Sequence, residues 1–261
     1  MHRTVGDVLR DWRKRRHLSQ LDLASEAGVS ARHLSFLETG RANPSRDILL
    51  RLADGLEVPL RERNSLLVAG GFAPVYPERP LSDPALAAVR NAVELVLRGH
   101  EPHPALAVDR TWTLLSANRA ASFLLQGVAP ELLAPPVNVL RLVFHPDGVA
   151  PRIVNRDVLL PMLIERLGHE ISVTGDTRLG ALRDELLGYP AMRELGSNRN
   201  SEPGIVVPFT IATDAGVLSF ISTTTVFGTP SDVTVEELAI ESFFPADSAT
   251  AEAMRSAVSD V

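Results

Sequence analysis

The residues whose types and spacing suggest a chemical task lie between Ser30 and Gly40. If this segment is a helix, Leu34 and Leu37 face the core, and the outer surface carries Ala31, Arg32, Ser35 and Phe36. The planar guanidinium of arginine donates two parallel hydrogen bonds to guanine in the major groove of DNA. A helix of about ten residues spans about 15 Å, which suits a major groove about 12 Å wide. The spacing therefore predicts a helix that reads base pairs, and Ser30, its N-terminal cap, is counted among the DNA contacts.

Other helices must hold this segment in place, and the sequence predicts four of them around it. Thr4 and Ser19 each have an aspartate three residues later, which is the pattern of a capping box at the start of a helix. Gly28 and Gly40 end the second and third helices, because glycine enters the left-handed region at little cost. Two further helices are predicted before residue 70. The sequence therefore predicts an all-α, five-helix domain.

Charge is distributed unevenly along the chain. The 261 residues carry a formal net charge of −6, but residues 1–72 hold 12 Lys and Arg against 9 Asp and Glu, a net of +3. The remaining residues therefore carry a net of −9. A basic first segment followed by an acidic remainder favours a polyanionic partner for the first segment alone.

The composition is that of a globular protein, with 45% hydrophobic and 22% charged residues. No stretch approaches the roughly 20 apolar residues that a membrane-spanning helix needs, and no apolar run follows a basic start as in a secretion signal. We therefore expect a cytoplasmic protein with no membrane partner.

Patterns typical of catalysis are absent from the sequence. There is no cysteine, which excludes disulfides, thiolate zinc sites and a cysteine nucleophile. Neither Gly-x-Ser-x-Gly, His-Glu-x-x-His nor a phosphate-binding loop occurs. His100 and His103 flank Glu101, but prolines follow both histidines closely, which favours an extended surface loop over a metal site. We expect no enzyme activity, no metal and no cofactor.

A linker is predicted after the helical domain, because residues 70–80 contain two glycines and three prolines. The predicted organisation is a DNA-binding domain over 1–72, a linker over 73–81 and a second domain over 82–261.

In the second domain the apolar residues change from helical spacing to an alternation of apolar and polar residues. A helix is predicted after Pro84, with an apolar stripe formed by Leu86, Val89, Val93, Val96 and Leu97. Strands are predicted over 105–109, 111–116, 205–211, 217–227 and 235–244, and helices over 118–125, 154–167, 177–187 and from 248. The last strand has an alternative, since Glu236-Glu237-Leu238 could instead begin a helix. These elements predict an α+β domain with an antiparallel sheet.

The first domain resembles the Cro/phage-repressor-like (XRE-type) helix-turn-helix family over residues 3 to about 69. The resemblance is carried by Leu18–Gly40, in which Ala24 allows a close helix crossing, and by the following Arg41-Ala42-Asn43-Pro44-Ser45. It implies that Gln20, Arg41 and Asn43 contact phosphates, while Ala31, Arg32 and Phe36 face base edges.

The second domain resembles the MmyB-like ligand-binding domain over about 85–257. The matching stretches are 105–112, 116–121, 138–142, 222–234 and 237–247. This resemblance implies a PAS-like α+β sensor fold that binds an apolar ligand, which is fatty-acid-like in at least some members.

Candidate ligand contacts come from aromatic, hydroxyl and arginine side chains. Thr223 and Thr225 share one face of a predicted strand, although threonine is also a good strand former in general. Arg141 and Arg152 could each clamp a carboxylate, although most arginines in proteins are exposed. The predicted ligand-binding set is Arg141, Phe209, Phe220, Thr223, Thr225 and Phe244.

These observations predict a transcriptional regulator that binds an operator as a homodimer and responds to a small apolar ligand. The alternative is a constitutive DNA-binding protein whose second domain only dimerises or recruits a partner protein. A buried cavity of a few hundred Å³ in the second domain would favour the sensor.

Overall fold

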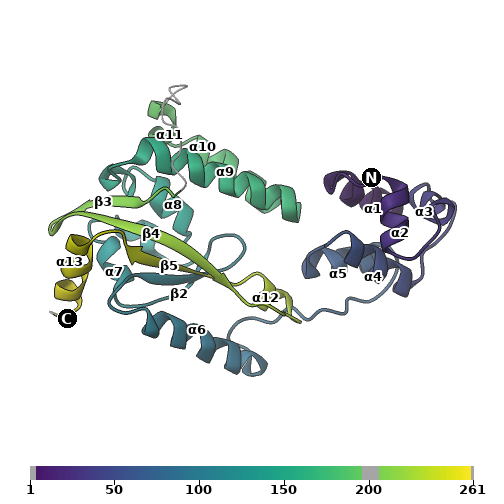
Figure 1. Ribbon diagram of the computed structural model, residues 1–261, viewed down its shortest axis with the longest axis horizontal. Coiled ribbons are helices and arrows are strands. Elements are labelled where there is room, and N and C mark those ends of the chain that lie inside the picture. The colour runs from purple at the N-terminus through teal and green to yellow at the C-terminus, as the bar shows by residue number, and fades with distance from the viewer. Residues whose placement is uncertain (1–3, 196–205, 260–261) are drawn as a thin grey trace. The chain divides into compact units, whose positions relative to one another are not determined.

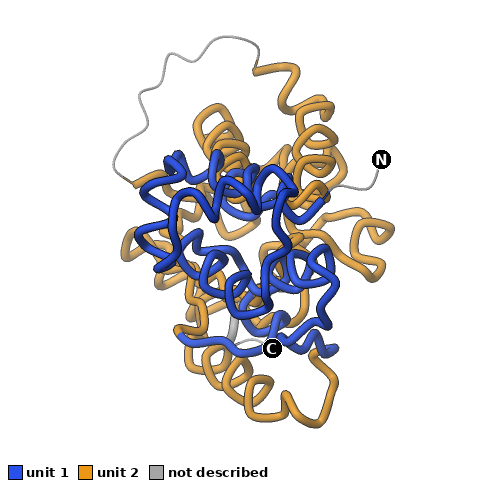
Figure 2. Tube along the Cα trace, turned by 90° about the vertical axis from the view of Figure 1, so that its right-hand side faces the viewer, with its two compact units in different colours: residues 1–80, 172–175, 229–236 blue, residues 81–171, 176–228, 237–261 orange. Residues whose placement is uncertain are grey.

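The computed structural model of the protein describes residues 4–195 and 206–259. The chain forms two compact units, drawn in blue and orange in Figure 2. Unit 1 comprises Met1–Pro80, Ser172–Gly175 and Thr229–Glu236, and unit 2 comprises Leu81–Ile171, Asp176–Gly228 and Glu237–Val261. The domain boundaries expected from the sequence, after residues 72 and 81, stay predictions.

Five helices form the N-terminal part of unit 1: α1 (Val5–Arg15), α2 (Gln20–Glu26), α3 (Ala31–Glu38), α4 (Arg46–Gly55) and α5 (Leu60–Ala69). Thr4 and Ser19 form the predicted capping boxes at the starts of α1 and α2. Ser30 and Ser45 cap α3 and α4, each hydroxyl accepting a backbone N–H three residues later. Each cap satisfies an N–H that the first turn of a helix leaves unpaired. The predicted all-α domain is confirmed.

Leucine side chains fill the core of these five helices. Gly28 and Gly40 follow α2 and α3 with φ of +64° and +70°, in the left-handed region that glycine favours. Burying one leucine contributes about 1.5–3 kcal/mol, so the cluster supplies most of the driving force for folding. Its fully or almost fully buried members are Leu9, Leu23, Leu34, Leu37, Leu49, Leu52, Leu56, Leu66 and Leu67.

Residues 229–236 also belong to unit 1. The carboxylate of Asp232 pairs with Arg79 at 2.8 Å, and the carboxylate of Glu236 accepts the backbone N–H of Leu60 at 2.8 Å. Leu60 is the first residue of α5, and the preceding Pro59 provides no side-chain cap. Glu236, from a distant part of the chain, therefore caps the N-terminus of α5.

Unit 2 is built on a five-stranded antiparallel sheet with the order β2-β1-β5-β4-β3. The strands are β1 (Ala105–Val108), β2 (Leu114–Ala117), β3 (Phe209–Thr213), β4 (Gly216–Val226) and β5 (Ala239–Pro245). In the β4–β5 ladder Ser222 lies opposite Phe243 and Thr224 lies opposite Glu241, so these four side chains share one face. The predicted α+β class with an antiparallel sheet is confirmed, and the topology is consistent with a PAS-like fold.

Helices cover both faces of this sheet. Figure 1 shows α6 (Ala87–Gly99) on one side and α9 (Arg156–Thr174) on the other. Val93 and Leu97 of α6 pack with Ala105 and Ile240 in a small cluster. The larger cluster lies on the opposite face and draws on α7 (Ala121–Leu124), α8 (Val139–Phe144), α9 and α10 (Thr177–Leu187). Short α11 (Pro190–Leu195) and α13 (Ser248–Ser259) complete the main helices described for this unit.

The last predicted strand, 235–244, is wrong in its first half. The chain forms a short helix, α12 (Val233–Glu236), before β5 begins at Ala239. The carboxylate of Asp232 accepts the N–H of Thr234 at 3.0 Å, and its backbone carbonyl accepts the N–H of Glu236. This cap starts a helical turn within a segment whose apolar pattern also suits a strand.

Other predicted elements differ at their ends. The strand expected over 111–116 begins only at Leu114, because the carboxylate of Asp109 accepts the N–H groups of Thr111 and Thr113 and folds them into a turn. Val96, at the edge of the predicted stripe, is 39% exposed. The helix expected over 118–125 is short, and α8 and α11 were not predicted. Residue 205, where a strand was expected to start, lies outside the described residues.

Candidate functional site

Helix α3 presents the side chains that the sequence predicts to read DNA. Arg32 is exposed, and its guanidinium lies 5.4 Å from the centre of the Phe36 ring. Ala31, Ser35 and Phe36 are half-buried, and the Ser30 hydroxyl accepts the N–H of His33 at 3.1 Å. Arg41 and Asn43 follow α3 as exposed residues. The predicted contacts on α3 and the loop after it therefore have side chains that solvent can reach.

A buried carboxylate holds the end of α3 against α1 and α2. Glu38 is 2% exposed and accepts hydrogen bonds from Arg13 at 2.6 and 2.9 Å. It also accepts the side-chain N–H of Gln20 at 2.8 Å. Burial alone raises the pKa of Glu38, but the bonds from Arg13 and Gln20 outweigh it, and the pKa lies below its ordinary value. This bond uses one of the two amide hydrogens of Gln20.

Part of the basic run at the end of α1 is structural. Arg13 is committed to Glu38, and Arg16 donates to the backbone carbonyls of Leu56 and Glu57 at 2.8 Å each. The Arg13 bond joins α1 to α3 and the Arg16 bonds join the end of α1 to the end of α4, so the two arginines stabilise the domain.

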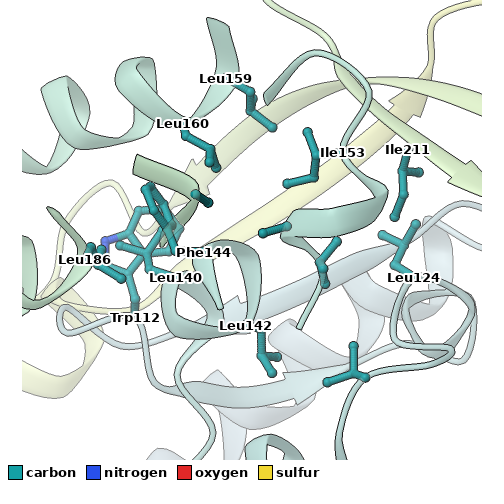
Figure 3. Packing of buried hydrophobic residues seen from close by; sticks show 14 of the residues in the cluster. Trp112, Leu124, Leu140, Leu142, Phe144, Ile153, Leu159, Leu160, Leu186 and Ile211 are labelled. Atoms are coloured by element: carbon teal, nitrogen blue, oxygen red, sulfur yellow. The ribbon is translucent and has the colours of Figure 1, made fainter. Parts of the chain in front are cut away.

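Unit 2 contains a cavity of about 130 Å³ between the sheet and helices α8 and α9. Its walls are mostly leucine, valine and phenylalanine, and Figure 3 shows the packing around Trp112, Leu124, Leu140, Leu142 and Leu159, which belong to the wall. Among the described residues that line it, three are polar: Arg166 on α9, Ser222 on β4 and Glu241 on β5. A cavity with these walls suits an apolar ligand with one polar end.

The polar end of the cavity is an ion-pair cluster. Arg166 donates to Glu241 at 2.6 Å and to the hydroxyl of Thr224 at 3.2 Å, and Thr224 donates to Glu241 at 2.9 Å. Its Nε atom lies 3.3 Å from a carboxylate oxygen of Glu170, one turn along α9. The guanidinium carbon lies 4.6 Å from the centre of the Trp112 ring. The sheet, the helix and the turn at Trp112 therefore meet at one arginine.

Burial shapes the protonation of this cluster. Burial raises the pKa of Glu170 above its ordinary value, although the bonds from Trp112 and Arg166 oppose the shift. Burial lowers the pKa of Arg166, but the bond to Glu241 outweighs it and the pKa is raised. Arg166 therefore stays charged in the folded protein.

An unusual backbone conformation sets Trp112 in the wall. Its φ is +63°, in a region that non-glycine residues rarely adopt. The Asp109 turn imposes this conformation, and the indole N–H donates to Glu170 at 3.0 Å. Backbone strain of this kind persists where surrounding structure fixes it, often at functional sites.

The predicted ligand contacts divide between the cavity and other surfaces. Phe209 lines the cavity, and the buried Phe220 stacks beside it with ring centres 6.4 Å apart. The remaining predicted residues do not line it. Arg141 pairs with Glu185 at 2.8 Å, Phe244 packs against His100, and Thr223 and Thr225 are exposed on the other face of β4.

Sequence reasoning missed Trp112, Arg166 and Glu241. One signal was available for Glu241. It lies two residues before Phe243 and so on the same face of an apolar strand, where a charged residue is unexpected. Another was the spacing of Arg166 and Glu170, which lie four residues apart on one helix face.

A capped helix-turn-helix unit and a unit with a largely apolar cavity are typical of a ligand-responsive DNA-binding regulator. Comparison with protein families agrees with this class. Residues 9–63 match the helix-turn-helix family model, and residues 89–257 match the MmyB-like transcription regulator ligand binding domain. The second match spans more than half of the chain, so the chain belongs to the MmyB-like transcription regulators.

Two curated relatives match the chain in part. One is a "Putative HTH-type transcriptional regulatory protein" of Methanoculleus marisnigri, 34% identical over 119 residues, which are 44% of this chain and 38% of the relative. The other is the "ImmF control region 10 kDa protein" of Bacillus phage phi105, 41% identical over 49 residues, which are 19% of this chain and 54% of the relative. The chain thus covers less than two thirds of each relative's length.

A solved structure, "Structure of an RNA-binding Light-Oxygen-Voltage Receptor", aligns with 98% of this chain and 63% of its own, at 11% identity and a TM-score of 0.27. That similarity is too low to indicate a shared arrangement. Over the described residues, no helix has the length and apolarity to span a membrane. Within the same residues, His, Asp and Glu form no group of three or more that could hold a metal ion.

Proposed function

We propose that this protein is a one-component transcription regulator that binds operator DNA and senses a small apolar ligand. Residues 1–72 are the DNA-binding domain, 73–81 the linker and 82–261 the sensor. The observation that carries the sensor role is the cavity of about 130 Å³, whose walls are apolar except at one end. It is not an enzyme in this proposal, and the cavity serves binding alone.

DNA recognition rests on α3 and its surroundings. Arg32 pairs with a guanine, while Ala31, Ser35 and Phe36 contact neighbouring base edges from the same face. Gln20, Ser30, Arg41 and Asn43 bind phosphates and set the depth of the helix in the groove. One reading helix covers only a few base pairs, so we propose a homodimer on half-sites about 34 Å apart.

The size of the cavity limits the ligand. A cavity of about 150 Å³ lined by aliphatic and aromatic side chains holds benzene in another protein, so about six carbon atoms fill the present one. Each methylene buried contributes about 0.8 kcal/mol. We therefore propose a straight aliphatic ligand, fatty-acid-like in its chain, whose longer members must open the cavity or extend beyond it.

The chain segment between β4 and β5 can couple ligand binding in the cavity to the DNA-binding unit. Ser222 of β4 and Glu241 of β5 line the cavity, and residues 227–238 connect these two strands. Within this connection, residues 229–236 belong to unit 1, where Glu236 caps α5. A ligand that shifts β4 against β5 changes the position of this connection. The coupling requires that the ligand prefer one arrangement, since equal affinity for both shifts nothing.

A chain-length series tests the proposal. The full-length protein is heated with straight-chain C3 to C10 compounds, and the melting temperature of unit 2 is followed. We expect it to rise with chain length until the cavity is filled. A matched variant, Leu163→Trp, places an indole in the cavity and should show no rise. If no compound of any length stabilises the wild-type protein, the second domain is better explained as a dimerisation or partner-binding domain.

A further inference from the structure

The polar end of the cavity contains more acceptors than donors. All three nitrogen atoms of Arg166 already donate to oxygens of Glu170, Thr224 and Glu241. The hydroxyl hydrogen of Thr224 is donated to Glu241. A carboxylate has about four lone-pair sites, and Glu241 accepts three of these hydrogen bonds, so it can accept a further one. Four of the five N–H groups of Arg166 are engaged in this way, and the other donor that lines this end is the hydroxyl of Ser222. A ligand head entering here therefore meets more acceptor capacity than donor capacity.

The net charge at the polar end of the cavity also favours a ligand head that donates hydrogen bonds. Arg166 and Glu241 are the charged residues among the described cavity-lining positions, and they cancel. Glu170 adds a second carboxylate behind them, held by Arg166 and by the indole of Trp112. The cluster therefore carries two carboxylates for one guanidinium.

We propose that this cavity selects an aliphatic ligand whose head donates hydrogen bonds and carries no negative charge, an alkylamine first and an alkyl alcohol second, in preference to a fatty-acid anion. This inference rests on the proposed sensor function and names the chemical class of its ligand. Arg166 acts here as a partner of Glu241, and Glu241 is the residue that sets specificity.

Binding of a ligand with a carboxylate head is unfavourable at this site. To form a two-point ion pair with Arg166 it must displace Glu241, whose side chain is only 5% exposed. That displacement leaves a buried carboxylate without its cation and brings a third carboxylate beside it, and unpaired buried charges are strongly disfavoured. An ammonium or hydroxyl head instead donates to Glu241 without breaking the pair with Arg166.

The experiment compares three straight-chain ligands of eight carbon atoms: octylamine, octan-1-ol and octanoate. Their dissociation constants for the full-length protein are measured at pH 7 by isothermal titration calorimetry. We expect octylamine to bind at least about tenfold more tightly than octanoate, with octan-1-ol between them. This ranking is measured on the wild-type protein and needs no variant to fold.

An isosteric variant tests the assigned residue. Glu241→Gln removes one negative charge and frees Arg166, so octanoate should gain about tenfold in affinity while octylamine weakens. Glu165→Gln is the matched control, because Glu165 is exposed on α9 beside Arg166 and loses the same charge outside the cavity. The control should keep the wild-type ranking.

The outcomes separate the two claims. Tightest binding of octanoate by the wild-type protein overturns the inference and leaves the sensor function standing. An unchanged ranking in a folded Glu241→Gln variant overturns the role of Glu241. Failure of all three compounds to bind overturns the proposed apolar-ligand sensor itself, and the inference with it.

Discussion

Replacing Glu38 by alanine should destabilise the DNA-binding unit severely. The Glu38 side chain is 1% exposed and the side chain of its partner Arg13 is 13% exposed, so the variant leaves a largely buried guanidinium without its anion. Breaking a buried ion pair from one side costs about 3–5 kcal/mol. Whole domains have about 5–15 kcal/mol of stability, so the loss is a large share of the total. For a domain of this size it corresponds to a fall in melting temperature of about 12 °C or more.

Tryptophan fluorescence can follow this loss in the full chain. The protein has two tryptophans, Trp12 in unit 1 and Trp112 in unit 2, so a Trp112→Phe background reports on unit 1 alone. Urea unfolding in that background gives the free energy of unfolding with and without Glu38→Ala. Glu26→Ala, an exposed site on α2, is the control and should change it by less than about 0.5 kcal/mol. A loss below about 1 kcal/mol for Glu38→Ala would refute the assigned role of the ion pair.

Three further predictions concern Arg32, Leu163 and Glu38. Arg32→Ala should weaken operator binding by about 1–3 kcal/mol and relax the preference at one base pair, measured by binding-site selection from random DNA; equal losses on operator and random DNA would argue against base readout. Leu163→Trp should abolish binding of the eight-carbon compounds while the total helix content by circular dichroism is unchanged, and undiminished binding would place the ligand elsewhere. Because the pKa of Glu38 is lowered by folding, its contribution is present above the unfolded pKa of about 4.3 and is lost as pH falls through the folded value. The stability difference between wild type and Glu38→Gln should therefore shrink below about pH 4 and stay constant above pH 5; a constant difference down to pH 2 would contradict the shift.

The helical unit could be predicted in detail because its signals are local. The caps Thr4, Ser19 and Ser30 and the stop glycines Gly28 and Gly40 act within a few residues of where they stand. Leucine spacing then fixes which face is buried. The buried Glu38 was not predicted, because its partners Arg13 and Gln20 lie 25 and 18 residues away in the sequence.

The cavity was predicted as a class of site and located only in part. Alternation along β4 divides Ser222 and Thr224 from Thr223 and Thr225, but the pattern alone does not tell which face meets α9. The threonines predicted as ligand contacts, Thr223 and Thr225, lie on the face of β4 that does not line the cavity. Phe209 was placed in the wall because an aromatic residue on a half-buried strand points to the core whatever covers it.

Arg141 shows why the sequence did not identify the charged residue at the cavity. It was predicted to orient the polar end of a ligand, and it instead forms a surface pair with Glu185 of α10. The arginine that lies at the cavity, Arg166, is distinguished by tertiary partners on β4 and β5 that lie 58 and 75 residues away. No local pattern separates these two arginines.

The central claim is that an apolar ligand in the cavity alters DNA binding. The most direct measurement is the affinity of the full-length protein for its selected operator by fluorescence anisotropy, titrated with and without saturating octylamine, and repeated with Leu163→Trp. The account predicts a change of at least about fivefold in the operator dissociation constant for the wild-type protein and none for the variant, since couplings between sites are commonly about 1–3 kcal/mol. Equal operator affinity with and without a ligand that demonstrably occupies the cavity would contradict it.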